Sequence, residues 1–194
     1  MLNGEDRWSI LLDDDRKFIV GALRRRFDQQ WNKEISIKVI CFIWKAVQKR
    51  ILTVKALQEK GVLIKSLGCG SFISCFDCVD HIIVHCPFTC EIRREIFKWC
   101  GIYQSMFNNL EDIISFINTW GNGSKKNNRF IAISYGMIWN LLKYRNDMLF
   151  KSIFTSPSKG VDFIKSSVYL WIKRRGRGEI CKWGDWVSSP FHTC

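Results

Sequence analysis

The stretch CGSFISCFDCVDHIIVHC, residues 69–86, concentrates side chains of the types that bind transition metals. It holds four of the nine cysteines and two of the three histidines of the chain. Zinc typically takes four thiolate or imidazole donors in tetrahedral geometry. Nine cysteines without a secretory signal are typical of a reducing compartment, where such a cluster favours a metal site over disulfides. The stretch therefore predicts a small domain folded around one zinc ion.

The candidate metal ligands are five residues of this stretch: Cys69, Cys75, Cys78, His81 and Cys86. Two combinations of four donors fit a zinc site. One omits Cys69, and the other joins Cys69 to one of Cys75 and Cys78, together with His81 and Cys86. His85 and Cys90 lie close enough in the sequence to be further candidates. The alternative interpretation is that the cysteines are buried and pack as small hydrophobic side chains.

Composition limits the fold and the partners. The chain has 194 residues, of which 47% are hydrophobic, so it can bury a real core. It carries 30 basic and 18 acidic residues, and its net charge of +12 favours polyanionic partners such as RNA or DNA. No apolar run reaches about 18 residues, which predicts no membrane span. We therefore expect an intracellular protein of the nucleus or cytoplasm, without a small-molecule substrate.

The hydrophobic pattern predicts a mainly α fold with one short β-hairpin at residues 7–20. A helix is expected at residues 35–49, and a second one begins at Thr53 and stops at Gly61. Residues 80–85 should form one or two helical turns, with His81 and Cys86 near the two ends. Pro87 then begins a helix that reaches about residue 99, with Arg93 on its outward face.

Further helices follow in the second half of the chain. Asn109 is expected to cap a helix that stops at Gly121, and the polar run 122–128, NGSKKNN, reads as a linker. A strong amphipathic helix follows the linker, and residues 161–174 form the last one. The predicted organisation is a hairpin plus a helical Cys/His domain at 1–121, the linker at 122–128, and a helical extension with a basic tail at 129–194.

Four stretches resemble motifs of one protein family, in the same order. They are IKVICFIWKAVQKRILTVKALQEKGV at 37–62, DHIIVHCPF at 80–88, IWNLLKYRNDMLF at 138–150 and VYLWIKRRGRGEICKWGDWVSSP at 168–190. They resemble the zinc-binding domain at the C-terminal end of plant LINE-type reverse transcriptases. The resemblance implies a small helical zinc-binding domain, here detached from its polymerase, with a retroelement polymerase as a possible partner.

The chain departs from that family's pattern, which is close to Cys-x2-Cys-x8-His-x4-Cys. Counted back from His81, the first cysteine is Cys69, and the second position is Phe72, which cannot bind a metal. Either Cys75 or Cys78 takes the missing place, or the site has decayed. The polymerase's paired aspartates have no counterpart here, so the resemblance and the residues alike predict no enzyme.

Two functions are compatible with these features. The first is a non-catalytic, zinc-dependent nucleic-acid-binding module, in which clustered basic residues contact phosphates. The candidate contacts are Arg24, Arg25, Arg26, Lys125, Lys126, Arg129, Lys173, Arg174, Arg175 and Arg177. The second is a structural or protein-interaction remnant with a decayed metal site and no nucleic-acid ligand.

Overall fold

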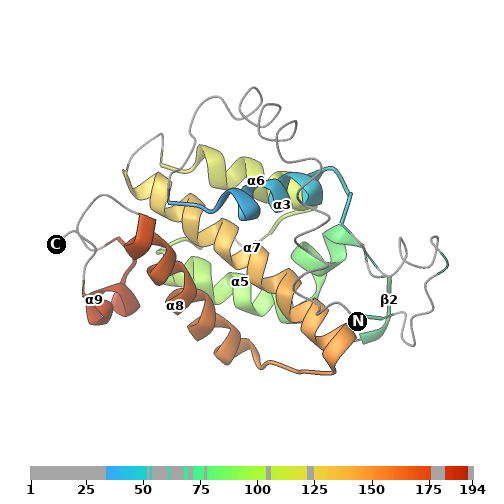
Figure 1. Cartoon of the computed structure of the whole chain (residues 1–194). Coiled ribbons are helices and arrows are strands. Elements are labelled where there is room, and N and C mark those ends of the chain that lie inside the picture. Colours follow the sequence, from blue (N-terminus) through green and yellow to red (C-terminus); the bar gives the residue numbers. More distant parts are fainter. Residues whose placement is uncertain are drawn as a thin grey trace. The chain divides into compact units, whose positions relative to one another are not determined.

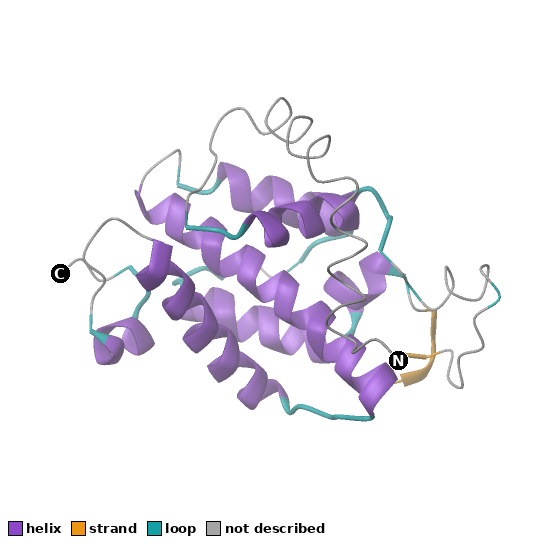
Figure 2. Cartoon of the chain, viewed as in Figure 1, coloured by secondary structure: helices purple, strands orange, loops and turns teal. Residues whose placement is uncertain are grey.

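The structure is a computed structural model of the whole chain, which divides into two compact units, residues 1–32 and 33–194. It describes residues 34–51, 53, 61, 68–69, 72–76, 78–103, 106–121, 125–175 and 182–191. The β-hairpin expected at residues 7–20 lies outside this part. The described residues are mainly helical, as predicted, and the remaining regular structure is a two-stranded sheet (Figure 2).

The helical elements follow one another through the second unit. They are α3 (Ile37–Val47), η1 (His81–His85), α5 (Pro87–Trp99), α6 (Leu110–Thr119), α7 (Lys125–Lys151), α8 (Pro157–Arg175) and α9 (Trp183–Ser188). The strands β1 (Gly68–Cys69) and β2 (Phe72–Phe76) pair antiparallel just before η1. No helix within the described residues is long and apolar enough to cross a membrane.

Helix α7 is the central element of this unit. It runs between α3 and α6 on one side and α5 and α8 on the other (Figure 1), and it contacts all four of them as well as η1. Its residues 130–138 are all buried, as expected for a helix with neighbours on every side. The helix begins at Lys125, inside the segment predicted as a linker, and residues on both sides of that segment belong to the same compact unit.

Several helix ends follow the signals in the sequence. Pro87 is in the first turn of α5, where its missing N–H leaves no hydrogen bond unmade. Gly101, just past the end of α5, has a φ of 68°, a conformation that favours glycine. Asn109 caps α6, since its side-chain oxygen accepts a hydrogen bond of 2.8 Å from the amide of Asp112. These three predictions are confirmed.

The longest helices, α7 and α8, pack against each other in antiparallel directions. Gly136 of α7 approaches Val168 so closely that a β-carbon there would lie 2.4 Å from Val168 Cγ2. Nearer the other end of the pair, the hydroxyl of Tyr144 donates to the carbonyl of Gly160 at 3.3 Å. Residue numbers therefore rise along α7 as they fall along α8, so the start of α7 lies beside the end of α8.

Candidate metal centre and nucleic-acid interface

The predicted metal ligands follow the chain from the sheet into the first turn of helix. Cys69 ends β1, Cys75 lies in β2, and Cys78 lies between β2 and η1. In the sheet register Cys69 pairs with Phe72, so the residue that replaces the family's second cysteine lies directly across from the first. The side chains of Cys69 and Cys75 are outside the described part of the structure.

His81 and Cys86 are joined by a π-helical turn. The amide of Cys86 donates a hydrogen bond of 2.7 Å to the carbonyl of His81, five residues earlier. On an α-helix, residues five apart would be rotated by about 140° from each other. The π-turn closes after five residues instead, which brings the backbone of residue 86 closer to lying above that of residue 81. Single π-turns of this kind are rare and often occur at functional sites.

Cys78 holds the start of the same turn. Its sulfur accepts a hydrogen bond of 3.3 Å from the amide of His81, and its carbonyl accepts one of 3.0 Å from the amide of Ile82. Cys78 is exposed, whereas Cys86 is 6% exposed. The sulfur of Cys78 thus accepts one of the amides that have no backbone partner at the start of a helical segment.

Helix α5 holds the end of the turn through its side chains. Arg93 Nη1 donates to the carbonyls of Ile83 and Val84, both at 3.0 Å, and the Thr89 hydroxyl donates to the carbonyl of Ile82 at 2.6 Å. Arg93 is only 5% exposed, so the prediction that it faces outward is wrong. Helical periodicity misplaced it, because the carbonyls at the end of η1 need a donor on that face of α5.

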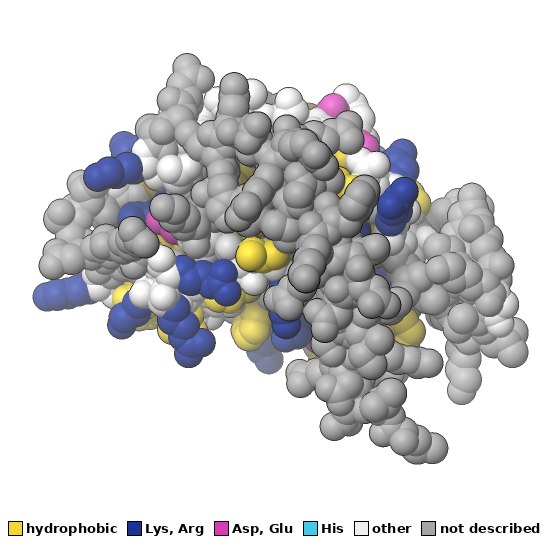
Figure 3. Space-filling model, turned by 45° about the horizontal axis from the view of Figure 1, so that its top comes forward, with side chains coloured by type: hydrophobic (Ala, Val, Ile, Leu, Met, Phe, Trp, Pro, Cys, Tyr) yellow, Lys and Arg dark blue, Asp and Glu magenta, His cyan; other side chains and the backbone are white. Residues whose placement is uncertain are grey.

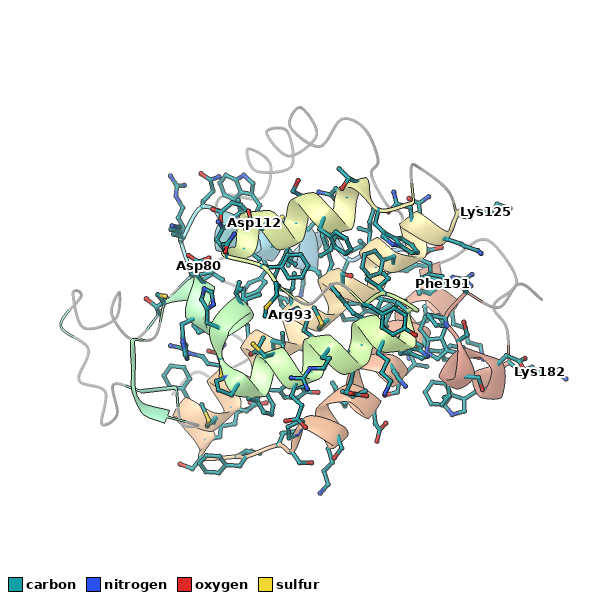
Figure 4. All side chains as sticks on the ribbon, turned by 180° about the vertical axis from the view of Figure 1, so that it is seen from behind. Asp80, Arg93, Asp112, Lys125, Lys182 and Phe191 are labelled. Carbon is teal, nitrogen blue, oxygen red and sulfur yellow. The ribbon has the colours of Figure 1, made fainter. Side chains whose placement is uncertain are left out.

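The two further ligand candidates have other hydrogen-bond partners. The Cys90 thiol donates to the carbonyl of Val84 at 3.0 Å, and His85 Nε2 donates to the carbonyl of Asn108 at 2.9 Å. On the other side, Asp80 Oδ1 accepts the amide of Leu110 at 3.0 Å, which ties the start of η1 to α6. Figure 4 shows Asp80 beside Asp112, close to this start of α6. The His81–Cys86 turn is therefore held by both α5 and α6.

The fit of these residues to zinc is partial. Thiolate and imidazole donors suit the ion, and the π-turn brings the backbone positions of two of them closer together around η1. Within the described residues, however, no three side chains of cysteine, histidine, aspartate or glutamate are grouped to hold a metal. A complete site would need donors from Cys69 or Cys75.

Comparison with known proteins finds a similarity that includes the Cys/His segment. Residues 7–92 match the family described as zinc-binding in reverse transcriptase. The match covers fewer than half of the 194 residues and ends within α5, so the motifs at 138–150 and 168–190 lie beyond it. No curated protein and no solved structure matches the chain. Residues 7–92 are thus similar to a reverse-transcriptase zinc-binding module, and the helices α6–α9 lie outside that similarity.

Part of the predicted nucleic-acid surface gathers at one end of the helices. Because α7 and α8 are antiparallel, residues 125–129 at the start of α7 lie beside residues 173–175 at the end of α8. Dark-blue Lys and Arg side chains gather at this end, on the left of Figure 3. Lys125, Lys126, Lys173, Arg174 and Arg175 are exposed there. Arg24, Arg25, Arg26 and Arg177 lie outside the described residues.

Two of the predicted arginines also serve the fold. Arg129 Nη1 donates to the carbonyl of Pro190 at 3.0 Å, and Arg175 Nη1 donates to the carbonyl of Ile35 at 3.3 Å. Arg129 also lies near Glu34, whose pKa is raised by burial and partly lowered again by the Arg129 charge. These contacts bring residues 34–35 and 190 to the same end, which we call the basic end: Lys125, Lys126, Arg129, Lys173, Arg174, Arg175 and Lys182.

The lysines at the start of α7 occupy positions that are unfavourable for a cation on that helix. A helix N-terminus carries a partial positive charge, so cations there are unfavourable, whereas Lys173–Arg175 at the end of α8 are favourable. No acidic residue lies in the first turn of α7. The positive end of the α7 dipole and the two ammonium groups together give this surface a positive charge that suits an anion such as a phosphate.

Proposed function

We propose that the chain is a non-catalytic nucleic-acid-binding module that carries one structural zinc ion. The similarity of residues 7–92 to the zinc-binding family of reverse transcriptases supports the metal part of this proposal. The charge of +12 and the basic end support the nucleic-acid part. The zinc ion would stabilise the segment from β1 to η1, and the helices would present the phosphate-binding surface.

The π-turn between His81 and Cys86 is the observation that carries the zinc assignment. A His-x4-Cys pair on an ordinary α-helix would point its donors in different directions. The π-turn reduces this mismatch in the backbone, and Arg93 and Thr89 hold the carbonyls within it. His81 and Cys86 are therefore the proposed core of the ligand set, with two of Cys69, Cys75 and Cys78 completing it.

The basic end would bind the backbone of RNA or DNA through charge. Such binding releases counterions, so the logarithm of the affinity falls linearly with the logarithm of the salt concentration, by about 0.9 for each phosphate contact on duplex DNA. The test is fluorescence anisotropy with a labelled duplex and a labelled single strand, across a salt series. An affinity that is unchanged by salt would exclude the proposed binding mode.

A matched pair of double variants locates the contacts. Lys125→Gln/Lys126→Gln removes two charges from the basic end, and Lys151→Gln/Lys159→Gln removes two exposed charges at the opposite end of the α7–α8 pair. The first should reduce the salt slope on duplex DNA by about 1.8, and the second should leave it nearly unchanged. Equal effects of the two variants would mean that only the net charge matters.

An exposed apolar patch favours a second candidate, a protein-interaction module. Phe150, Ile153 and Phe154 are 58%, 53% and 73% exposed, and the last two line the same pocket as Cys86. Exposed aromatic side chains in a group often mark protein interfaces. The proposed partner is a retroelement polymerase domain. Co-elution with such a domain that is lost in Phe150→Ser/Phe154→Ser would support this candidate, and no co-elution of the unaltered chain would reject it.

A further inference from the structure

Helix α9 presents an exposed tryptophan at the basic end. Trp183 is 45% exposed, and it is the only tryptophan classed as exposed in the part of the chain that the structure describes. Lys182, which precedes it, lies at the same end of the helices as Lys125 and Phe191 (Figure 4). The hydrogen bond from Arg129 to Pro190 and the stacked rings of Trp120 and Phe191 join α9 to this end.

Trp183 is held by a series of ring contacts that reaches the core. Its ring centroid lies 5.2 Å from that of Tyr169, which lies 5.7 Å from Trp186, which in turn lies 5.1 Å from Trp99. Trp186 is fully buried, and its Nε1 donates to the carbonyl of Lys165 at 3.0 Å. Trp99 Nε1 donates to the carbonyl of Trp186 at 3.1 Å. The outermost ring is therefore positioned before any ligand arrives, which lowers the entropy cost of binding.

Basic residues at the end of α8 lie near the aromatic pair that Trp183 forms with Tyr169. Lys173 Nζ lies 5.8 Å from the centroid of Tyr169, the ring that Trp183 contacts. Arg174 follows on the last turn of α8, and it is exposed. The one acidic residue of α9 is Asp185, also exposed. An exposed indole at the basic end offers a flat apolar face for a base, and the cations of that end offer positive charge for the adjoining phosphates.

We propose that this surface binds single-stranded nucleic acid, with an unpaired base stacked on Trp183 and its backbone along the basic end. The inference rests on the proposed function and specifies the class of nucleic acid. Base faces are covered in a duplex and open in a single strand, so only a single strand can use the indole. Stacking tolerates every base, so the surface selects strandedness rather than sequence.

Trp183→Ala is the test, measured by anisotropy with labelled oligo(dT) and with a duplex that has the same number of phosphates. The expected result is an affinity for the single strand that is about 5- to 100-fold weaker and a duplex affinity that is unchanged. Trp183→Phe should restore most of the lost affinity, because its ring can still stack. Leu170→Ala is the matched control, since Leu170 is 47% exposed on α8 and has no aromatic ring.

The outcomes separate this inference from the proposed function. If the unaltered chain binds neither nucleic acid, the proposed function itself fails. If it binds both and Trp183→Ala weakens neither or both equally, the stacking site is wrong while charge-based binding stands. Vesicles with phosphatidylserine serve as the competing partner, because tryptophan and lysine also suit an anionic membrane. Trp183-dependent binding to vesicles but not to oligo(dT) would overturn the inference.

Discussion

Replacing Arg93 tests whether α5 holds the π-turn that carries His81 and Cys86. The guanidinium is 5% exposed and donates to two carbonyls of η1, and its central carbon lies 5.6 Å from the ring centroid of Phe107. Arg93→Met keeps most of the apolar stem and removes the donors. It therefore isolates the hydrogen bonds from the loss of packing volume.

The expected loss of stability follows from the acceptors. Hydrogen bonds from a charged donor contribute about 1.5 to 3 kcal/mol each. The carbonyl of Val84 still accepts a hydrogen bond from the Cys90 thiol in Arg93→Met. The main loss is therefore the hydrogen bond to the carbonyl of Ile83. The ring contact with Phe107 adds about 0.5 to 1 kcal/mol. We expect Arg93→Met to lower the free energy of unfolding by about 2 to 4 kcal/mol.

Urea unfolding followed by circular dichroism measures this loss. Arg94→Met is the matched control, because Arg94 is the exposed neighbour on the same helix, and its replacement should change the free energy by less than about 0.5 kcal/mol. If the two variants lose the same small amount, Arg93 does not hold the turn, and the proposed rigidity of the His81–Cys86 pair is wrong.

Two further predictions concern helix packing and pH. Gly136→Ala should lower the melting temperature, because the added β-carbon would lie 2.4 Å from Val168 Cγ2. Gly184→Ala is the control, since its β-carbon meets no atom within 4 Å and the change should be neutral or stabilising. Equal melting temperatures of the two variants would contradict the close approach of α7 and α8. Burial raises the pKa of Glu34 despite the Arg129 charge, so the folded state disfavours its ionised form, and stability from this group is lost as pH rises from the unfolded-state pKa through the folded-state pKa. Glu34→Gln should therefore gain stability relative to the unaltered chain as the pH rises above the unfolded-state pKa of Glu34. Paired thermal melts that differ by the same amount at each pH would refute this.

Much of the helical structure could be predicted from local signals. Pro87, Gly101 and Asn109 mark helix ends whose chemistry is decided within a few residues, so the sequence suffices to place them. Gly61, expected to stop a helix by its positive φ, has a φ of 74°, although most of the helix before it lies outside the described residues. The start of α7 was misjudged, because NGSKKNN is polar throughout and its role depends on which neighbours cover it.

The candidate site was only partly predictable, for a physical reason. The His-x4-Cys spacing predicts His81 and Cys86 as ligands, but the π-turn between them follows from contacts made by α5. Arg93 reads as a solvent-facing residue on a helical wheel, and its burial depends on carbonyls ten residues earlier. The exposure of Trp183 likewise depends on tertiary packing. The other tryptophans among the described residues are buried or half-buried, and the sequence does not distinguish Trp183 from them.

The most direct measurement is the zinc content of the purified chain and of three variants, determined by elemental mass spectrometry. The account predicts one zinc ion per chain, lost in His81→Ala and in Cys86→Ser, and kept in Cys90→Ser, where serine can still donate to the carbonyl of Val84. Stripping the ion with a chelator should also reduce the helical signal. A chain without zinc, or with zinc that survives His81→Ala, would contradict the proposed metal centre.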